Sequence, residues 1–260
     1  MGDLAYLACS DINSRYAWTP ATLHLNASAL PEISTDHIST YNFVTGEITQ
    51  LELKGLPAVA KGIWVHAIEI RADEKDSDQL TVMLNSHRPP QDRSTSHLVG
   101  ADSVIELFRT TVGSTTLEWV KTVAHPLIRT PNNIAAVGSD KFYISNDHAR
   151  KVHWTRKLEV LKGEGSDIVY CDASGAEVDC KVAADGVAFP NGSFLPSFVN
   201  VRYGELIRYV LGMAKGPGNT IYSASSLEGD VRQWEIQADN TLVLLDQYTV
   251  HLPSLHLYSR

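Results

Sequence analysis

Residues 131–148 read "PNNIAAVGSDKFYISNDH", and this stretch sets the interpretation of the whole chain. An alternating apolar run fills its middle, which predicts two short β-strands. Asn132 and Asn133 stand near its start, and the triplet Asn-Asp-His closes it at residues 146–148. Because a buried strand needs no polar side chains at its ends, these residues serve either as turn residues or as ligands.

Similar strands recur along the chain and indicate the architecture. Each is a short apolar strand that ends in small polar residues, and an alternating strand and a further strand follow it. The first unit ends in "ITQLELKG" at residues 48–55. The last three units have an additional strand in front. The four units begin with "LAYLACSD" from Leu4, "QLTVMLNSH" from Gln79, "KFYISNDH" from Lys141 and "NTIYSASS" from Asn219.

Four-stranded units repeated in order are typical of the blades of a β-propeller. We therefore predict an all-β fold, a β-propeller with about four four-stranded blades that form a single, incomplete domain over residues 1–260. A β-sandwich with many strands is the alternative, and the ordered repetition disfavours it.

Composition narrows the class of partner. Hydrophobic residues make up 43% of the 260 residues and charged residues 20%, which suffices for a sizeable core. The net charge is −8 without any basic cluster, so a nucleic-acid partner is not expected. No apolar run is long enough for a transmembrane span, and the first residues lack the basic region of a signal peptide. The chain itself gives no cellular location.

The segment "CDASGAEVDC", from Cys171 to Cys180, predicts a β-hairpin. A two-residue turn at residues 175–176 would place the two cysteines opposite each other at a spacing that a disulfide can span. The same register makes Asp172 face Asp179, which is unfavourable. A disulfide and two free thiols therefore both remain open. The triplet Asn26-Ala27-Ser28 matches a glycosylation acceptor, a pattern that also arises by chance.

Polar residues cluster at the predicted axis of the propeller. His66, Asn132 and Asn133 stand at the starts of predicted innermost strands, and Asn191 in "FPNGSF" has the corresponding place in the fourth blade. Their side chains are expected to converge on one point. Amide oxygens suit a hard cation such as Ca²⁺ and do not suit zinc. Each asparagine taken singly is equally explained as a turn residue.

Three histidines accompany these amides: His66 in "IWVHAIEI", His87 in "LNSHRPP" and His148. A histidine beside a metal can act as a general base for water, and Asp147 would orient it. The alternative is a histidine that bonds a backbone carbonyl. The motifs of serine hydrolases, zinc proteases and nucleotide-binding loops are absent, whereas a pair of glycosidase carboxylates remains open.

These motifs, taken in chain order, resemble the serum paraoxonase/arylesterase family. The likeness runs from about Leu4 to Val250. It implies a six-bladed propeller with two calcium ions in the central channel, one structural and one catalytic. The catalytic ion polarises the carbonyl of a lactone or aryl ester, and two histidines activate water. It also implies a protein that is secreted or associated with the endoplasmic reticulum or with lipoprotein, and the triplet at Asn26 adds the expectation of a glycoprotein.

The resemblance assigns the ligands. Asn132 and Asn191 would bind the catalytic calcium, Asn133 would replace an aspartate at the structural calcium, and Ile68 would offer that ion its carbonyl. The family also has a Glu-Asp pair before Leu4 and an Asp-Asn pair beyond the fourth blade, which this sequence lacks. We therefore expect a form truncated at both ends, with weak or no activity.

The sequence thus predicts a calcium-dependent hydrolase of small aryl esters or lactones. By the resemblance, His66 and His87 are the histidine pair that activates water, and Asp147 and His148 line the site. Two alternatives remain open. One is a non-catalytic propeller fragment that binds a partner through its face, and the other is a gluconolactonase-like hydrolase with a different set of ligands at the axis.

Overall fold

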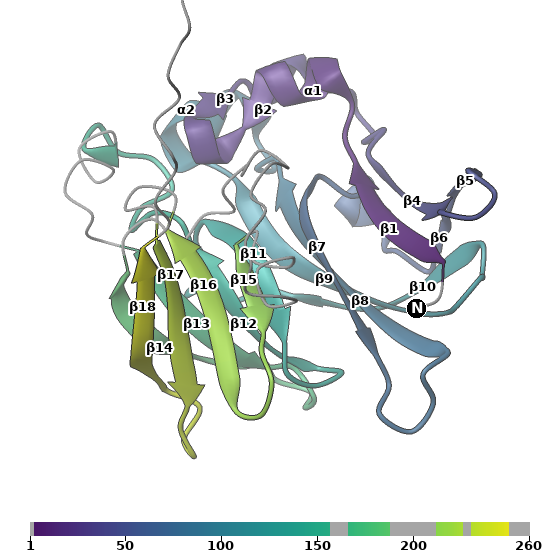
Figure 1. Cartoon of the computed structure of the whole chain (residues 1–260). Helices are drawn as coiled ribbons and strands as arrows, with labels where there is room; N and C mark the ends of the chain where they lie inside the picture. The colour runs from purple at the N-terminus through teal and green to yellow at the C-terminus, as the bar shows by residue number, and fades with distance from the viewer. Residues whose placement is uncertain (1–2, 157–165, 188–211, 226–229, 250–260) are drawn as a thin grey trace, which may run out of the picture.

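The computed structural model describes residues 3–156, 166–187, 212–225 and 230–249, and β-strands dominate it (Figure 1). Four sheets follow one another along the chain and are arranged as a four-bladed β-propeller. Each sheet is one blade. The prediction of an all-β propeller with about four blades is confirmed, whereas the number of strands differs from blade to blade.

The strand order of each blade follows the chain with one exception. Blade 1 contains β1 (Leu4–Cys9), β4 (His37–Asn42) and β5 (Ile48–Gln50). Blade 2 contains β7 (Val65–Ala72), β8 (Gln79–Arg88), β9 (Asp102–Thr111), β10 (Thr116–Val123) and β6 (Glu52–Lys54). Blade 3 contains β11 (Pro131–Ala136), β12 (Lys141–Asn146), β13 (Ser166–Asp172) and β14 (Asp179–Val187). Blade 4 contains β15 (Met213–Lys215), β16 (Thr220–Ser225), β17 (Asp230–Ile236) and β18 (Leu242–Thr249).

The exception is the segment at residues 48–55, which was predicted as one outer strand. It splits at Leu51 into β5, which pairs with β4, and β6, which pairs in parallel with β10 of the next blade. Leu51 is buried between the two blades, and its amide donates to the carbonyl of Ile38 over 2.8 Å. The prediction of a single strand at residues 48–55 is therefore wrong, because Leu51 carries the chain from blade 1 to blade 2.

The hydrophobic core lies between neighbouring blades. On β9, Leu107 packs against blade 3 while its neighbour Phe108 packs against blade 1, as expected when successive side chains point to opposite faces of a strand. A third cluster, which includes Tyr143 and Trp234, joins blades 3 and 4. The strands β1, β7, β11 and β15 lie next to one another in sequence order and form the inner edge of the four blades.

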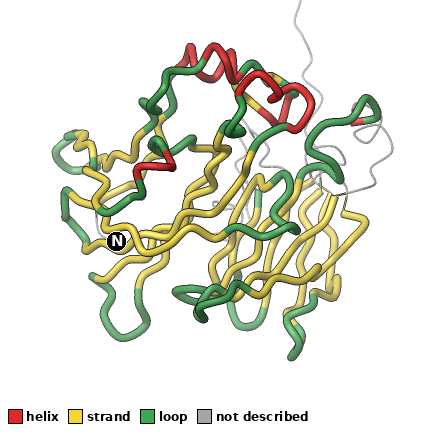
Figure 2. Tube along the Cα trace, turned by 180° about the vertical axis from the view of Figure 1, so that it is seen from behind, coloured by secondary structure: helices red, strands yellow, loops and turns green. Residues whose placement is uncertain are grey.

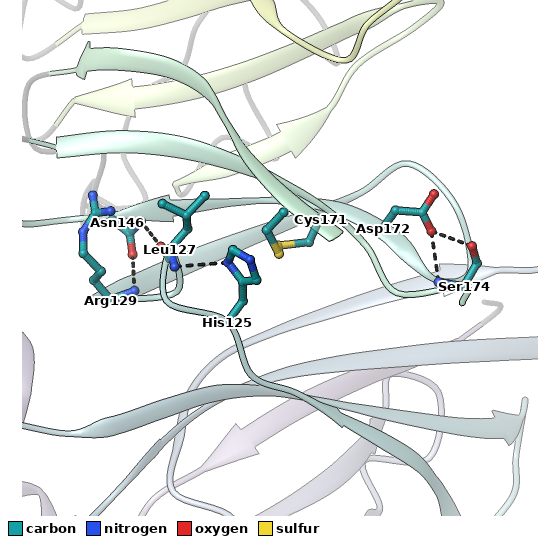
Figure 3. The surroundings of a disulfide bond; sticks show 8 residues. His125, Leu127, Arg129, Asn146, Cys171, Asp172 and Ser174 are labelled. Atoms are coloured by element: carbon teal, nitrogen blue, oxygen red, sulfur yellow. Dashed lines mark hydrogen bonds between the residues drawn. A yellow bond between two sulfur atoms is a disulfide. The ribbon is translucent and has the colours of Figure 1, made fainter. Parts of the chain in front are cut away.

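A disulfide joins β13 to β14 at Cys171 and Cys180, which decides between the two alternatives that the sequence left open (Figure 3). The register also pairs Asp172 with Asp179. The expected two-residue turn is wrong, because the strands end at these aspartates and a six-residue loop at 173–178 joins them. Asp172 is held by the Oγ of Ser174 over 2.6 Å and by the Nζ of Lys141 over 3.0 Å. These bonds lower the pKa of Asp172 to about 2 and offset the repulsion between the facing carboxylates.

Short elements cover one face of the blades (Figures 1 and 2). Asp11 starts the first helix by accepting a hydrogen bond from the amide of Ser14 over 2.8 Å. No helix in the described part of the chain is long and apolar enough to cross a membrane. The elements of this cover are α1 (Ile12–Ala17), β2 (Trp18–Thr19), η1 (Pro20–Thr22), β3 (His24–Leu25), η2 (Ala27–Ala29), η4 (Arg93–Thr95) and α2 (Ser96–Val99). A further turn, η3 (Ala58–Ala60), precedes β7.

Candidate active site

His66 lies at an irregularity of the inner strand of blade 2. The register between β7 and β8 shifts between Val65 and Ala67, so His66 is the extra residue of a β-bulge. Bulges re-aim a side chain out of the regular pleat. The ring of His66 meets the ring of His87 edge-on, with centroids 4.9 Å apart and an interplanar angle of 61°. The two histidines therefore form a pair at one end of blade 2.

Asn132 occupies a matching irregularity in blade 3. The register between β11 and β12 shifts between Pro131 and Asn133, which makes Asn132 the extra residue of a second bulge. Its Nδ2 lies 3.1 Å from Nε2 of His66, so side chains from two bulges meet across the boundary between blades. An Nε2 that accepts from the amide leaves the proton of the neutral ring on Nδ1. That Nδ1 is buried and has no partner.

Burial controls the charge of both histidines. It lowers the pKa of His66 to about 4, and the positive charge of Arg15 adds to the effect. The pKa of His87 is also well below its usual value, chiefly because of burial and then because of its neighbour His66. Both rings are therefore uncharged at neutral pH. An uncharged imidazole can accept a proton, whereas an imidazolium cannot.

Two contacts fix the position of His87. Its Nδ1 lies 2.8 Å from Oγ of Ser103 on the adjacent strand β9, and its carbonyl accepts from the indole Nε1 of Trp18 over 2.7 Å. Trp18 belongs to the cover, so the cover is anchored directly on this residue. Two cavities of about 10 Å³ each adjoin His87, and one of them also touches Asp147. Each is about the volume that one water molecule needs.

Asp147 lies directly after β12 and is 2% exposed. Its Oδ2 is 3.5 Å from Nδ2 of Asn132, and its Oδ1 has no hydrogen-bond partner. Burial raises the pKa of Asp147 to about 6, while the guanidinium of Arg156 acts in the opposite direction. The side chain is thus a buried carboxyl with one oxygen available.

Arg156 is 1% exposed and ties the segment that follows β12 within blade 3 to the cover. Its guanidinium donates to the carbonyls of Pro20, Ala21 and Lys151 over 3.0, 3.1 and 2.6 Å. Its positive charge acts on Asp147 from this position. The arginine therefore holds the cover in place beside the candidate site.

Asn85 is a residue that the sequence analysis missed. It lies on β8 two residues before His87, and its Nδ2 donates to the carbonyl of Pro131 in blade 3. Its Oδ1 is fully buried and has no partner. The alternation of side chains along a strand puts residues 85 and 87 on one face, and this spacing in "LNSH" was the signal that could have found it.

Glu69 is a second missed group, three residues after His66 on β7. Its Oε1 accepts from the amide of Ala136 at the end of β11 over 3.2 Å. Burial raises the pKa of Glu69 to about 7. The inner strands of blades 2 and 3 therefore also enclose Glu69. Its contact with β11 lies at Ala136, at the end of that strand opposite to Asn132.

Of the other predicted residues, His148 adjoins this group, whereas Asn133 and Ile68 make their contacts elsewhere. The side chain of Asn133 lies against Gly212 of blade 4, and its Oδ1 accepts from the amide of Ile134 over 2.7 Å. Ile68 follows His66 on β7, and its side chain packs into the core between blades 1 and 2. His148 is buried beside Asp147, and its ring interacts with the backbone of Ala21.

Asn191 lies outside the described residues, so its predicted approach to Asn132 stays a prediction. The structure brings together His66, His87, Asn132 and Asp147 among the predicted residues.

The donor atoms at this site are oxygens, which are the ligands that a hard cation prefers. The Oδ1 atoms of Asn85 and Asp147 are buried oxygens without partners, and both residues adjoin the start of β11 at Asn132. Oxygen donors of this type are those that calcium prefers. Among the described residues, no group of three or more His, Cys, Asp or Glu side chains could hold a metal. A cation here would therefore depend on amides and a single carboxylate.

Comparisons with known proteins give a consistent likeness. A family model described as Arylesterase matches residues 35–203, which is more than half of the chain. The serum paraoxonase/arylesterase 1 of Mus musculus is 29% identical over 146 residues, covering 56% of this chain and 36% of the mouse protein. That of Homo sapiens is 30% identical over 131 residues, covering 49% of this chain and 36% of the human protein. The chain thus spans about a third of the length of these curated relatives.

A likeness to solved structures extends over most of the chain. The major allergen Mala s 1 of Malassezia sympodialis is 12% identical, with a TM-score of 0.42. The alignment covers 85% of this chain and 74% of the allergen.

Proposed function

Because the chain belongs to the arylesterase family, we propose that it is an esterase- or lactonase-type hydrolase with its reaction centre at His66, His87 and Asn132. One observation carries this proposal. The contact between Nε2 of His66 and Nδ2 of Asn132 joins two β-bulges from adjacent blades, next to a second uncharged histidine. Bulges are over-represented next to active sites, where they re-aim a side chain.

In the proposed reaction His87 acts as a general base. A water molecule in the cavity between His87 and Asp147 gives a proton to the imidazole and attacks the carbonyl of the substrate. In the tautomer in which Nδ1 donates to Oγ of Ser103, Nε2 is the nitrogen that accepts the proton. His66 packs edge-on against this ring and is itself uncharged at neutral pH. General-base catalysis of this kind contributes about 10²–10⁴ in rate.

We further propose that Asn85, Asn132 and Asp147 hold a hard cation such as Ca²⁺. Supporting this are the partnerless Oδ1 atoms of Asn85 and Asp147, since a buried oxygen without a partner calls for a ligand. When bound, a divalent cation would polarise the carbonyl of an ester or lactone. Aryl esters are the first substrates to test, because the relatives are named arylesterases.

Hydrolysis of phenyl acetate and of a simple lactone by the purified chain tests this function, in millimolar Ca²⁺ and in a chelator. We expect turnover with Ca²⁺ and a fall in kcat of about 100-fold or more for His66→Gln and His87→Gln. His24→Gln on β3 is the matched control, because this histidine is exposed, and it should leave kcat unchanged. A folded chain without turnover on either substrate would favour a binding module and contradict the proposal. Full activity in both histidine variants would equally contradict it.

A further inference from the structure

We propose that Asn26 is an N-glycosylation site and that the first sugar of its glycan packs on Trp154. The triplet Asn26-Ala27-Ser28 lies on the cover, where Asn26 immediately precedes η2. Ala27 is fully buried, whereas Asn26 and Ser28 are exposed on either side of it. This proposal is independent of the proposed hydrolase function.

The backbone presents the acceptor side chain to solvent. The amide of Ala27 donates to Oγ of Ser96 over 3.3 Å, and the same hydroxyl donates to the carbonyl of Leu25 over 2.6 Å. The amide of Asn26 donates to the carbonyl of Ala17 over 3.0 Å. The side chain of Asn26 makes no capping bond to the turn that follows. The turn is therefore anchored through its buried middle residue, and the acceptor amide points outward.

An open pocket of about 560 Å³ begins at the acceptor. Asn26 and Ser28 form one side, and Val152, His153 and Trp154 form another. This volume lies in the range of ligand-sized clefts. The pocket is therefore large enough to receive a sugar ring attached to Asn26.

Trp154 offers the surface on which that ring would rest. Its side chain is 78% exposed, and its indole lies 5.8 Å from the imidazole of His153 at an interplanar angle of 34°. An exposed indole is a large apolar surface, and its exposure to water is unfavourable in free energy. One face of a pyranose ring consists of C–H groups, so its contact with the indole would bury apolar area on both partners.

The charges around the pocket favour a neutral occupant. Arg93 is the only arginine or lysine among the described residues that line the pocket. Its guanidinium already donates to the carbonyls of Leu30, Pro31 and Glu32. It also lies 5.9 Å from the centre of the Trp64 ring. The guanidinium is therefore engaged in holding the cover, which suits an uncharged sugar better than an anion.

The disulfide is a second observation that favours glycosylation, because it indicates the cellular compartment. The disulfide between Cys171 and Cys180 requires an oxidising environment, which is where N-glycosylation also takes place. In the transfer, Nδ2 of Asn26 forms a bond to the anomeric carbon of an oligosaccharide carried on a polyprenyl diphosphate. The bond from that carbon to the diphosphate oxygen breaks, the diphosphate leaves with the electron pair, and Nδ2 loses a proton.

Site-resolved mass spectrometry of the full chain, secreted from a eukaryotic host behind an added signal peptide, tests the attachment. We expect a glycan on the peptide that contains Asn26. Asn26→Gln and Ser28→Ala should abolish it, and Ser28→Thr should retain it. A second triplet at Asn191 lies outside the described residues, so occupancy must be measured at each asparagine separately. An unmodified Asn26 peptide from folded, secreted protein would overturn the proposal.

The rate at which an amidase releases the glycan from the native protein tests the packing on Trp154. Burying about 40 Å² of apolar surface corresponds to about fivefold in an equilibrium constant. Trp154→Ala should therefore speed release from Asn26 about fivefold. Tyr16→Ala is the matched control, because Tyr16 is 75% exposed on α1 and does not line the pocket. Equal release rates in the wild type and in Trp154→Ala would overturn the proposed packing.

Discussion

Two buried asparagines in neighbouring parts of the propeller differ in how completely their amides are bonded. Asn146, at the end of β12, uses its whole amide, and Figure 3 shows two of its partners, Leu127 and Arg129. Its Oδ1 accepts from the amides of Arg129 and Thr130 over 3.0 and 2.9 Å. Its Nδ2 donates to the carbonyl of Leu127 over 2.8 Å and to Oδ1 of Asp167 over 2.7 Å. This asparagine joins three segments of blade 3 and leaves nothing for a ligand.

Asn85 shows the opposite pattern. Its Nδ2 bonds to the carbonyl of Pro131, while its Oδ1 is buried without a partner. Asp147, one residue after Asn146, also has a partnerless Oδ1. Buried polar atoms are nearly always bonded in folded proteins, so each exception needs an explanation. The comparison therefore separates amides that hold the fold from oxygens that are available to a ligand, although all of them lie within the same two blades.

The largest expected effect concerns the fully bonded amide. Asn146→Ala removes four hydrogen bonds, each worth about 1 kcal/mol, so we expect the free energy of unfolding to fall by about 3–4 kcal/mol. Urea denaturation followed by tryptophan fluorescence measures this. Asn42→Ala is the control, because Oδ1 of Asn42 accepts two bonds in an exposed turn, and its loss should cost about 1 kcal/mol. Equal losses in the two variants would remove the structural role of Asn146.

A smaller effect should appear at the available oxygens. If Ca²⁺ binds with a dissociation constant of about 10⁻⁴ M, 5 mM Ca²⁺ raises the free energy of unfolding by about 2 kcal/mol. Urea denaturation with and without Ca²⁺ measures the difference, and Mg²⁺ serves as the control ion. Asn85→Ala and Asn132→Ala should lose this calcium-dependent part, whereas Asn42→Ala should keep it. An undiminished calcium effect in both Asn85→Ala and Asn132→Ala would place the cation elsewhere.

The sequence predicted the strands well because their alternation is local. It also predicted the pairing of Cys171 with Cys180, although the loop between them is longer than expected. The segment at residues 48–55 was predicted as one strand, because nothing in its pattern indicates that Leu51 is clamped between two blades. A crossover of this kind depends on a partner strand far along the chain, which a local pattern does not contain.

The candidate site was only partly predictable for the same reason. His66, His87 and Asn132 were singled out from their places at the ends of predicted strands, the family resemblance gave them roles, and the structure brings them together. Nothing in the local pattern indicates that two β-bulges aim His66 and Asn132 at each other, since bulges arise from the pairing of strands. Trp18 was missed because its bond to His87 spans 69 residues of sequence.

The smallest expected effect is a pH dependence of the free energy of unfolding. It should arise from His148 and not from Asn146, two residues earlier in the chain. Burial lowers the pKa of His148 to about 4, and the charge of Arg156 adds to the effect. Between pH 6.5 and 4 the unfolded chain therefore binds a proton at His148 that the folded chain does not bind. The contribution of the neutral His148 ring to the free energy of unfolding is fully present above pH 6.5. It is lost as the pH falls toward 4. Asp147, whose pKa is raised to about 6, acts in the opposite direction between pH 3.8 and 6.

His148→Gln should remove the first of these two dependences. We expect the fall in the free energy of unfolding between pH 6.5 and 5 to shrink by about 1 kcal/mol per pH unit relative to the wild type. Urea denaturation at several pH values in the presence of a chelator measures the slope. Asn146→Ala is the matched control, because an amide does not titrate and its loss should lower stability equally at every pH. The same slope in His148→Gln and in the wild type would mean that His148 does not remain neutral in the fold, so that its burial costs nothing on acidification.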